Sequence, residues 1–194
     1  MKFDNYLKDD FTFLEEYVTI CEAVMLSEMS NQKFEEIRLA AKKLGLRVNR
    51  SDSIFDFLKD VSSTTSDFFR AAILYASTDM KDKKTKQVFV NDMKASLNRI
   101  NKKEMTAFLL VLDKSTLGLT SHVRHILQGL FGIEVTGYYQ LYQQHQQNIV
   151  NMRRELKTLK SHMANRGAGP DDMKIVTHFE MLIDNLEEEG VEWD

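Results

Sequence analysis

Apolar residues recur every three or four positions along almost every segment of this chain, as in Phe13, Leu14, Tyr17, Val18 and Cys21. That spacing is typical of amphipathic helices that bury one face. No segment alternates between apolar and polar residues for long enough to predict a sheet. The pattern therefore predicts an all-α fold, with an irregular bundle of about seven short helices followed by a long helix at about 136–165 and an antiparallel C-terminal helix at about 170–189.

Helix-breaking and helix-capping residues define the ends of these segments. Gly45 suits the position after a helix, where a left-handed backbone favours glycine. Asn101 and Glu104 have the spacing of a capping box, Thr120 is a candidate cap, and Pro170 suits a first helical position. The short helices are expected at about 10–28, 31–44, 53–61 and 68–76, from beyond the lysine-rich link 79–87 to about 99, from 101 to about 112, and at about 120–131.

A break at residues 132–137, with the sequence GIEVTG, precedes the long helix. We expect an N-terminal helical bundle over 1–133 and a second unit over 134–194, made of the long helix, the C-terminal helix and an acidic tail. The link RGAGP is short, and short links join antiparallel helices.

The long helix carries the most regular pattern of the chain, which we call the heptad seam. Its members, spaced three and four residues apart, are Val135, Tyr138, Tyr142, His145, Ile149, Met152, Leu156, Leu159 and Met163. An average period of 3.5 residues keeps one stripe of a long helix against a partner. The lower part, from Ile149, suits a coiled coil. The upper part is aromatic and does not.

Two uses of the heptad seam remain open. In the first, the C-terminal helix folds back along its lower part, and Tyr138, Tyr142 and His145 pack on the N-terminal helices. In the second, the seam binds another chain, and Glu155 of one copy faces Lys160 of the other. Both uses can hold if two hairpins pair into a four-helix bundle.

Composition adds a strong asymmetry of charge. Residues 1–78 carry a net charge of −3, residues 79–167 of +8 and residues 168–194 of −8. The basic middle and the acidic end can attract each other or separate partners. The densest basic region contains Lys81, Lys83, Lys84, Lys86, Lys94, Arg99, Lys102 and Lys103. It suggests nucleic-acid contacts, or else a solvated linker.

The helix at 120–131 offers a second candidate for nucleic-acid binding. Together with the preceding helix it resembles a helix-turn-helix in layout, with Arg124 on the exposed face. The turn between the two helices is longer than usual in that motif, and every helical bundle contains such pairs.

Signs of catalysis are missing from the sequence. His122 and His125 are three residues apart on one predicted helix, but a metal site needs a third ligand. Cys21 lies on an apolar stripe, which favours a buried role. There is neither a GxSxG motif nor a glycine-rich phosphate loop. We therefore expect no enzyme, no cofactor, no metal and no small-molecule substrate.

The acidic tail 187–194 contains Trp193, the chain's one tryptophan, which suggests a docking peptide. We predict a non-enzymatic interaction protein that oligomerises or docks into a larger complex through the long helix and this tail. The alternative is a nucleic-acid-binding accessory protein or regulator. The methionine-rich, proline-poor composition resembles that of small accessory proteins of large tailed phages or low-GC bacteria. We expect no membrane segment and a cytoplasmic setting, in the host cytoplasm or the virion if the chain is of phage origin.

Overall fold

The computed structural model describes residues 31–49, 54–78, 81–115, 118–189 and 191. Within these residues the chain forms eight helices and no strand, which confirms the predicted all-α fold. The predicted helix at 10–28, with Cys21, lies outside the described residues, and so does Trp193.

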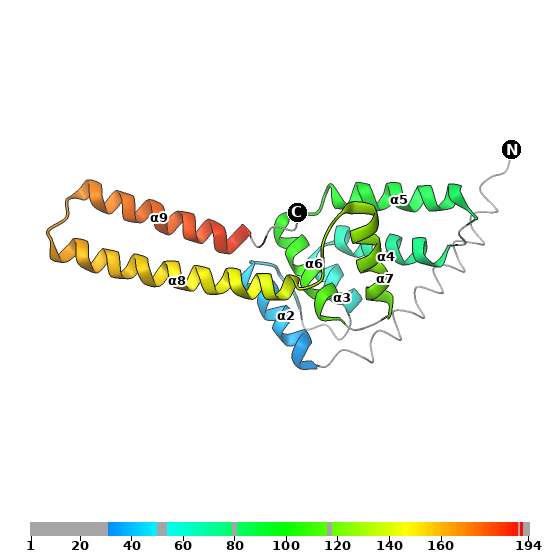
Figure 1. Ribbon diagram of the computed structural model, residues 1–194, viewed down its shortest axis with the longest axis horizontal. Helices are drawn as coiled ribbons and strands as arrows, with labels where there is room; N and C mark the ends of the chain where they lie inside the picture. Colours follow the sequence, from blue (N-terminus) through cyan, green and yellow to red (C-terminus); the bar gives the residue numbers. More distant parts are fainter. Residues whose placement is uncertain (1–30, 50–53, 79–80, 116–117, 190, 192–194) are drawn as a thin grey trace.

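Six helices make a compact body, and two longer helices form an arm that projects from it (Figure 1). The body contains α2 (Asn31–Lys43), α3 (Ile54–Val61), α4 (Ser63–Ser77), α5 (Lys83–Leu97), α6 (Lys102–Lys114) and α7 (Gly118–Phe131). The arm contains α8 (Tyr138–Asn165) and α9 (Pro170–Glu189), which run antiparallel as predicted.

Three predicted helix ends are confirmed. Gly45 follows α2 with φ of 78°, and its N–H donates to Lys42 O at 3.0 Å, so it ends the helix as glycine does in a left-handed cap. Asn101 and Glu104 form the capping box of α6, since each side chain accepts from the other residue's backbone N–H, at 3.0 and 3.2 Å. Pro170 opens α9.

Other helices begin earlier than their apolar periodicity predicts. Helix α4 starts at Ser63 rather than near 68, because the Ser62 hydroxyl accepts from Thr65 N–H at 3.2 Å. Helix α5 starts at Lys83, inside the predicted lysine-rich link, where the Asp82 carboxylate accepts from Thr85 N–H at 3.1 Å. The first turns of both helices are polar, so an apolar stripe does not reveal them.

The predicted cap at Thr120 is wrong, because α7 begins at Gly118 and Thr120 lies inside the helix. Its buried hydroxyl donates instead to Ser115 Oγ at 2.9 Å. Helix α8 is capped from a distance: the Asp113 carboxylate accepts from Gly137 N–H at 3.0 Å and from Tyr139 N–H at 2.8 Å. A carboxylate there also suits the positive end of the helix dipole.

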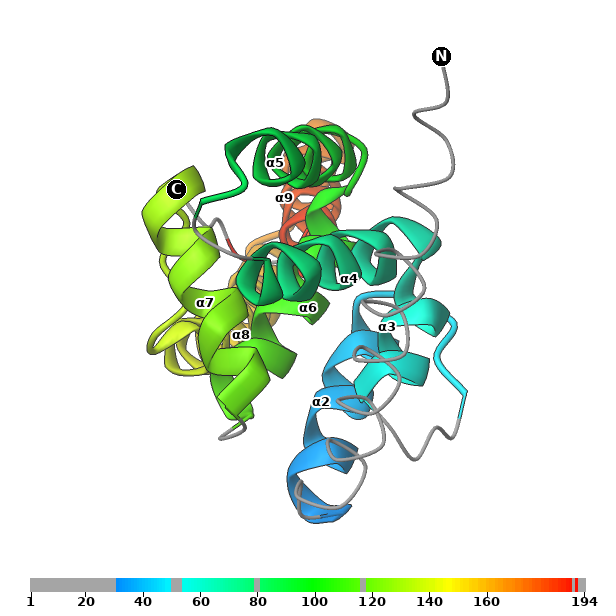
Figure 2. The ribbon, with the colours of Figure 1, turned by 90° about the vertical axis from the view of Figure 1, so that its right-hand side faces the viewer.

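Helix α6 lies at the centre of the body. Eight consecutive residues, Met105 to Leu112, are at most 2 % exposed, which means that neighbours surround this helix on all sides. Phe108 meets Phe68 and Phe69 of α4 edge to face, with ring centroids 5.6 and 6.4 Å apart. Helices α4 and α5 run side by side along one flank (Figure 2).

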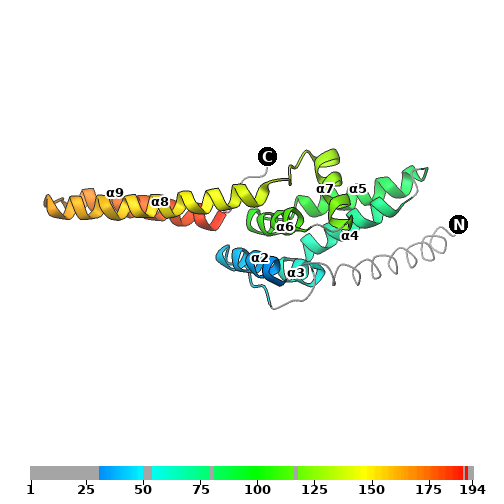
Figure 3. The same cartoon turned by 60° about the horizontal axis from the view of Figure 1, so that its bottom comes forward.

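The arm grows out of this core. Tyr138 and Tyr142, in the first turns of α8, are 1 % and 5 % exposed and belong to the core of the body. Beyond them the two arm helices lead away from the body together (Figure 3). The first turns of α8 therefore anchor the arm, while its outer part packs along α9.

Candidate docking surface on the arm

The base of the arm is held by a buried tyrosine. Tyr138 Oη donates to Val191 O at 2.8 Å and lies 3.3 Å from Thr106 Oγ1. Burial raises the pKa of Tyr138 to about 12, so the hydroxyl keeps its proton and its hydrogen bond at pH values above 10, where an exposed tyrosine ionises. Through Tyr138, the backbone at Val191 is linked to Thr106 of α6.

Opposite charges also meet at the base, as the charge asymmetry of the sequence allows. Lys103 Nζ lies 3.1 Å from Glu188 Oε2, and Lys102 Nζ lies 3.6 Å from Glu189 Oε2. These pairs join the first turn of α6 to the last turn of α9. Each is partly exposed, so they orient the arm more than they stabilise it.

The interior of the arm is apolar and narrow. Ile149 of α8 and Val176 and Ile183 of α9 are buried between the two helices, at 2 %, 0 % and 6 % exposure. Since α9 lies along the lower heptad seam, the intramolecular use of that seam is present in the structure.

One edge of this interior carries ion pairs, around a small hollow of about 250 Å³. Arg153 pairs with Asp184 at 2.8 Å and with Glu187, and Lys160 pairs with Glu180. The hydrogen bond with Glu187 is the main reason why the pKa of Arg153 is raised. On this edge Arg153 and Lys160 of α8 have partners on α9.

The opposite edge is open and apolar. A groove of about 490 Å³ runs between α8 and α9, and we call it the apolar groove. Its described lining consists of Met152, Glu155, Leu156, Leu159, Phe179, Leu182, Ile183 and Leu186. Leu159, Phe179, Leu182 and Leu186 are each 41–48 % exposed, and Glu155 is the one charged member of that lining. Contiguous exposed apolar side chains of this kind mark interaction surfaces.

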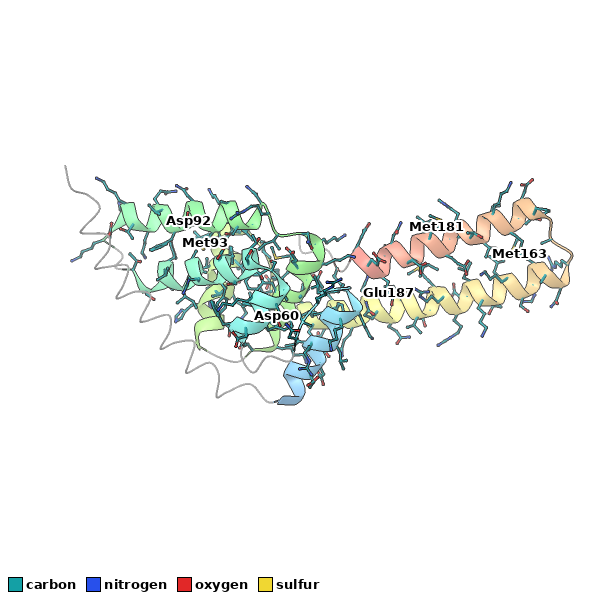
Figure 4. The ribbon with its side chains drawn as sticks, turned by 180° about the vertical axis from the view of Figure 1, so that it is seen from behind. Asp60, Asp92, Met93, Met163, Met181 and Glu187 are labelled. Carbon is teal, nitrogen blue, oxygen red and sulfur yellow. The ribbon has the colours of Figure 1, made fainter. Side chains whose placement is uncertain are left out.

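The arm is asymmetric in cross-section along much of its length. In Figure 4 Glu187 lies near the base, Met163 near the tip, and Met181 on α9 between them. Met181 is 59 % exposed and is not among the lining residues, so it serves as a reference position next to the groove.

The predicted interface residues separate into distinct groups. Met152, Glu155, Leu156 and Leu159 line the apolar groove. Tyr142 and Ile149 are buried within the chain, which corrects their assignment to an open interface. His145 Nε2 lies 3.0 Å from Leu186 O, and Met163 is half-buried near the tip. Lys160 is paired with Glu180 on the edge that carries the ion pairs, away from Glu155.

The α9 half of the groove was not predicted as a site. The stripe Ile175, Phe179, Leu182 and Leu186 has spacings of four, three and four residues, and all four side chains are 41–57 % exposed. We call it the outer stripe. It lies beside Val176 and Ile183 of the same helix, which are buried against α8. The signal that separates the two was its own heptad spacing.

A second hollow, of about 750 Å³, lies between α2 and α8 and is lined by four glutamines of α8. At its wall, Tyr139 Oη donates to Glu36 Oε2 at 3.1 Å, and Lys114 Nζ lies 3.5 Å from the Tyr139 ring centroid. Burial is the first cause, and the Glu36 carboxylate the second, of a raised pKa of Tyr139. These contacts fix α2 against the arm.

The basic candidates are distributed over α5, α6, α7, the link before α5 and the turn after it. Exposed members are Lys81, Lys83, Lys84, Lys94 and Arg99. Lys86 lies over the Tyr75 ring at 4.8 Å, Lys102 and Lys103 face the end of α9, and Arg124 is half-buried on α7. The residues that stay exposed therefore concentrate on α5 and in the segments that flank it.

The part of the chain that the structure describes contains no group of three or more His, Cys, Asp or Glu side chains that could hold a metal ion. His122 is exposed, and His125 Nδ1 lies 2.7 Å from Ser121 O. None of the described helices is both long enough and apolar enough to cross a membrane.

Comparison with protein-family models, with curated proteins and with solved structures gives no match to this chain. The function proposed below therefore rests on the geometry of the arm.

Proposed function

We propose that this chain is a non-enzymatic helical assembly protein that docks into a larger complex through the apolar groove of its arm. The observation that carries the proposal is the asymmetry of the arm, with ion pairs along one edge and exposed Leu159, Phe179, Leu182 and Leu186 along the other. An apolar groove between two helices is a common seat for a further helix.

The anchoring of the arm supports this proposal. Tyr138 and Tyr142 hold its base in the core, so the groove is presented at a defined distance and direction from the body. A rigid presentation lowers the entropy lost on binding. The Trp193 tail remains part of the proposal as a second contact. We place the protein in the cytoplasm, or in a virion, as an accessory or structural component of a phage or bacterium.

The test compares assembly size in extracts of the source cells for the tagged full-length chain and two variants. Leu182→Glu places a charge in the groove, and Met181→Glu makes the same change one residue away. We expect the wild type and Met181→Glu to elute in an assembly larger than one 22.6 kDa chain, and Leu182→Glu to elute in a smaller one. Equal elution of all three contradicts the proposal.

Nucleic-acid binding is the second candidate, and the exposure of Lys83, Lys84 and Lys94 on α5 favours it. Labelled DNA and RNA titrated with the purified chain should then bind with an affinity that falls steeply with salt. Replacing these three lysines by glutamine should abolish that binding. Absence of binding at low salt rules this candidate out.

A further inference from the structure

Helix α9 carries two heptad stripes side by side. The inner stripe, with Val176 and Ile183, faces α8 and is buried. The outer stripe, Ile175, Phe179, Leu182 and Leu186, occupies positions d, a, d and a of a heptad and remains exposed. A helix that packs against one neighbour needs one such stripe, and a helix of a larger bundle needs one for each neighbour.

We propose that a second copy of this chain covers the outer stripe, so that two arms pair antiparallel into a four-helix bundle. The inference rests on the proposed function, because it names the occupant of the same apolar groove. In the proposed dimer a two-fold axis passes between Phe179 and Leu182.

The register of the outer stripe fits such an axis. In antiparallel helix pairs, a positions face d positions. About the proposed axis Phe179 faces the partner's Leu182, and Ile175 faces the partner's Leu186. All four members are thus used at once, and the surface is complementary to itself, as a two-fold interface requires.

The length of the arm fits as well. Helix α9 has 20 residues, about 30 Å, and the proposed axis crosses it near its middle. The antiparallel partner then brings its own body just beyond the RGAGP tip of the first arm. The two bodies lie at opposite ends of the bundle and do not compete for the groove.

The area available is that of a modest dimer. Five exposed side chains, the outer stripe and Leu159, are 41–57 % exposed. At ~200 Å² for a large side chain they offer ~500 Å² per copy. A stable dimer buries about 800 Å² per partner, and Met152, Leu156 and the polar rim lie in place to supply the remainder.

Charge opposes this pairing only at its two ends. The arm, residues 138–189, carries six basic and eight acidic side chains, so two arms repel each other only weakly. His178 and Asn185 flank the middle of the outer stripe on its solvent side. At each end of the contact Asp172 faces the partner's Glu189, and Lys102, whose Nζ lies 3.6 Å from Glu189 Oε2, offsets part of this repulsion. A strongly charged partner finds little to bind in a groove whose described lining has one charged member, Glu155.

The first test measures the mass of the purified full-length chain by sedimentation equilibrium. We expect the mass of two 22.6 kDa chains for the wild type and for Met181→Glu. Phe179→Glu should give the mass of one chain, and the milder Phe179→Ala should weaken association by at least tenfold, because each substitution acts twice at a two-fold contact. Far-UV circular dichroism confirms that each variant is folded.

The second test determines the register by disulfide formation, in a chain whose native cysteine is removed by Cys21→Ser. Ile175→Cys and Leu186→Cys are prepared separately and mixed under oxidising conditions. The antiparallel pair predicts a disulfide between the two different variants. A parallel pair predicts that each variant links to itself, and that result overturns the proposed axis.

A wild type that has the mass of one chain at every concentration overturns self-pairing, and so does a dimer that Phe179→Glu leaves intact. Neither result removes the proposed function. If the assembly in source-cell extracts still depends on Leu182 and not on Met181, the groove docks a different chain.

Discussion

Tyr138 Oη donates a hydrogen bond of 2.8 Å to Val191 O, two residues beyond the last helix. The contact spans 53 residues of sequence. It attaches the segment that follows α9 to the buried first turn of α8. Tyr142, one turn later on α8, is also buried, yet its hydroxyl has no hydrogen-bond partner among the described residues. The two tyrosines therefore make a matched pair for measurement.

Removing the two hydroxyls should have different effects on stability. Tyr138→Phe breaks a made hydrogen bond and leaves the Val191 carbonyl without it, so we expect a loss of about 1 kcal/mol in the free energy of unfolding. Tyr142→Phe removes an unpaired buried hydroxyl and should be neutral or stabilising. Urea unfolding followed by circular dichroism measures both, and an equal loss for the two variants contradicts the role of Tyr138.

Alkaline pH should destabilise the fold through the same residues. Burial raises the pKa of both Tyr138 and Tyr142 from 10.0 to about 12. The unfolded chain therefore loses these protons first, and the stabilisation present below pH 10 declines as the pH rises towards 12. We expect about 1 kcal/mol per tyrosine between pH 10 and 11. The decline should be shallower for Tyr142→Phe than for the wild type, and parallel profiles contradict this assignment.

The buried interior, rather than the ion pairs, should hold the arm together. Ile183→Ala empties a site that is 6 % exposed and should cost about 2 kcal/mol or more. Arg153→Ala removes exposed pairs with Asp184 and Glu187 and should cost less than about 1 kcal/mol, with a smaller effect at high salt. Hydrogen exchange of the α9 amides reports both changes. A larger effect for Arg153→Ala reverses this ranking.

The capping box of α6 offers a test of local structure. Asn101→Ala should lower the free energy of unfolding by about 1 kcal/mol, since the side-chain oxygen of Asn101 accepts the hydrogen bond from Glu104 N–H. Glu104→Gln keeps a side-chain acceptor for the Asn101 N–H and should cost less. Thermal unfolding of the full chain compares them, and a cost for Glu104→Gln equal to that for Asn101→Ala speaks against the capping box.

Much of the fold could be predicted because its signals are local. Gly45, the Asn101–Glu104 pair and Pro170 act within one turn of chain, and the sequence shows them directly. The start of α8 is different, because its cap is the Asp113 carboxylate from another helix. A contact between residues 24 positions apart leaves no local pattern.

Only part of the candidate site could be predicted from the sequence, because the rest depends on contacts between helices. The heptad spacing identified Met152, Leu156 and Leu159 on α8, and these residues line the groove. Spacing alone does not tell which of two adjacent stripes on α9 meets α8. That choice depends on how the arm closes, with Val176 and Ile183 inside and Arg153 paired at one edge, and only the structure shows it.

In the proposed function, another polypeptide covers the apolar groove of the working protein. The most direct measurement places a photo-crosslinking amino acid at Leu182 in the full-length chain in source cells, with Met181 as the reference position. We predict covalent adducts to protein from position 182 and few from position 181. An absence of adducts at position 182, or equal adducts at both positions, contradicts the claim.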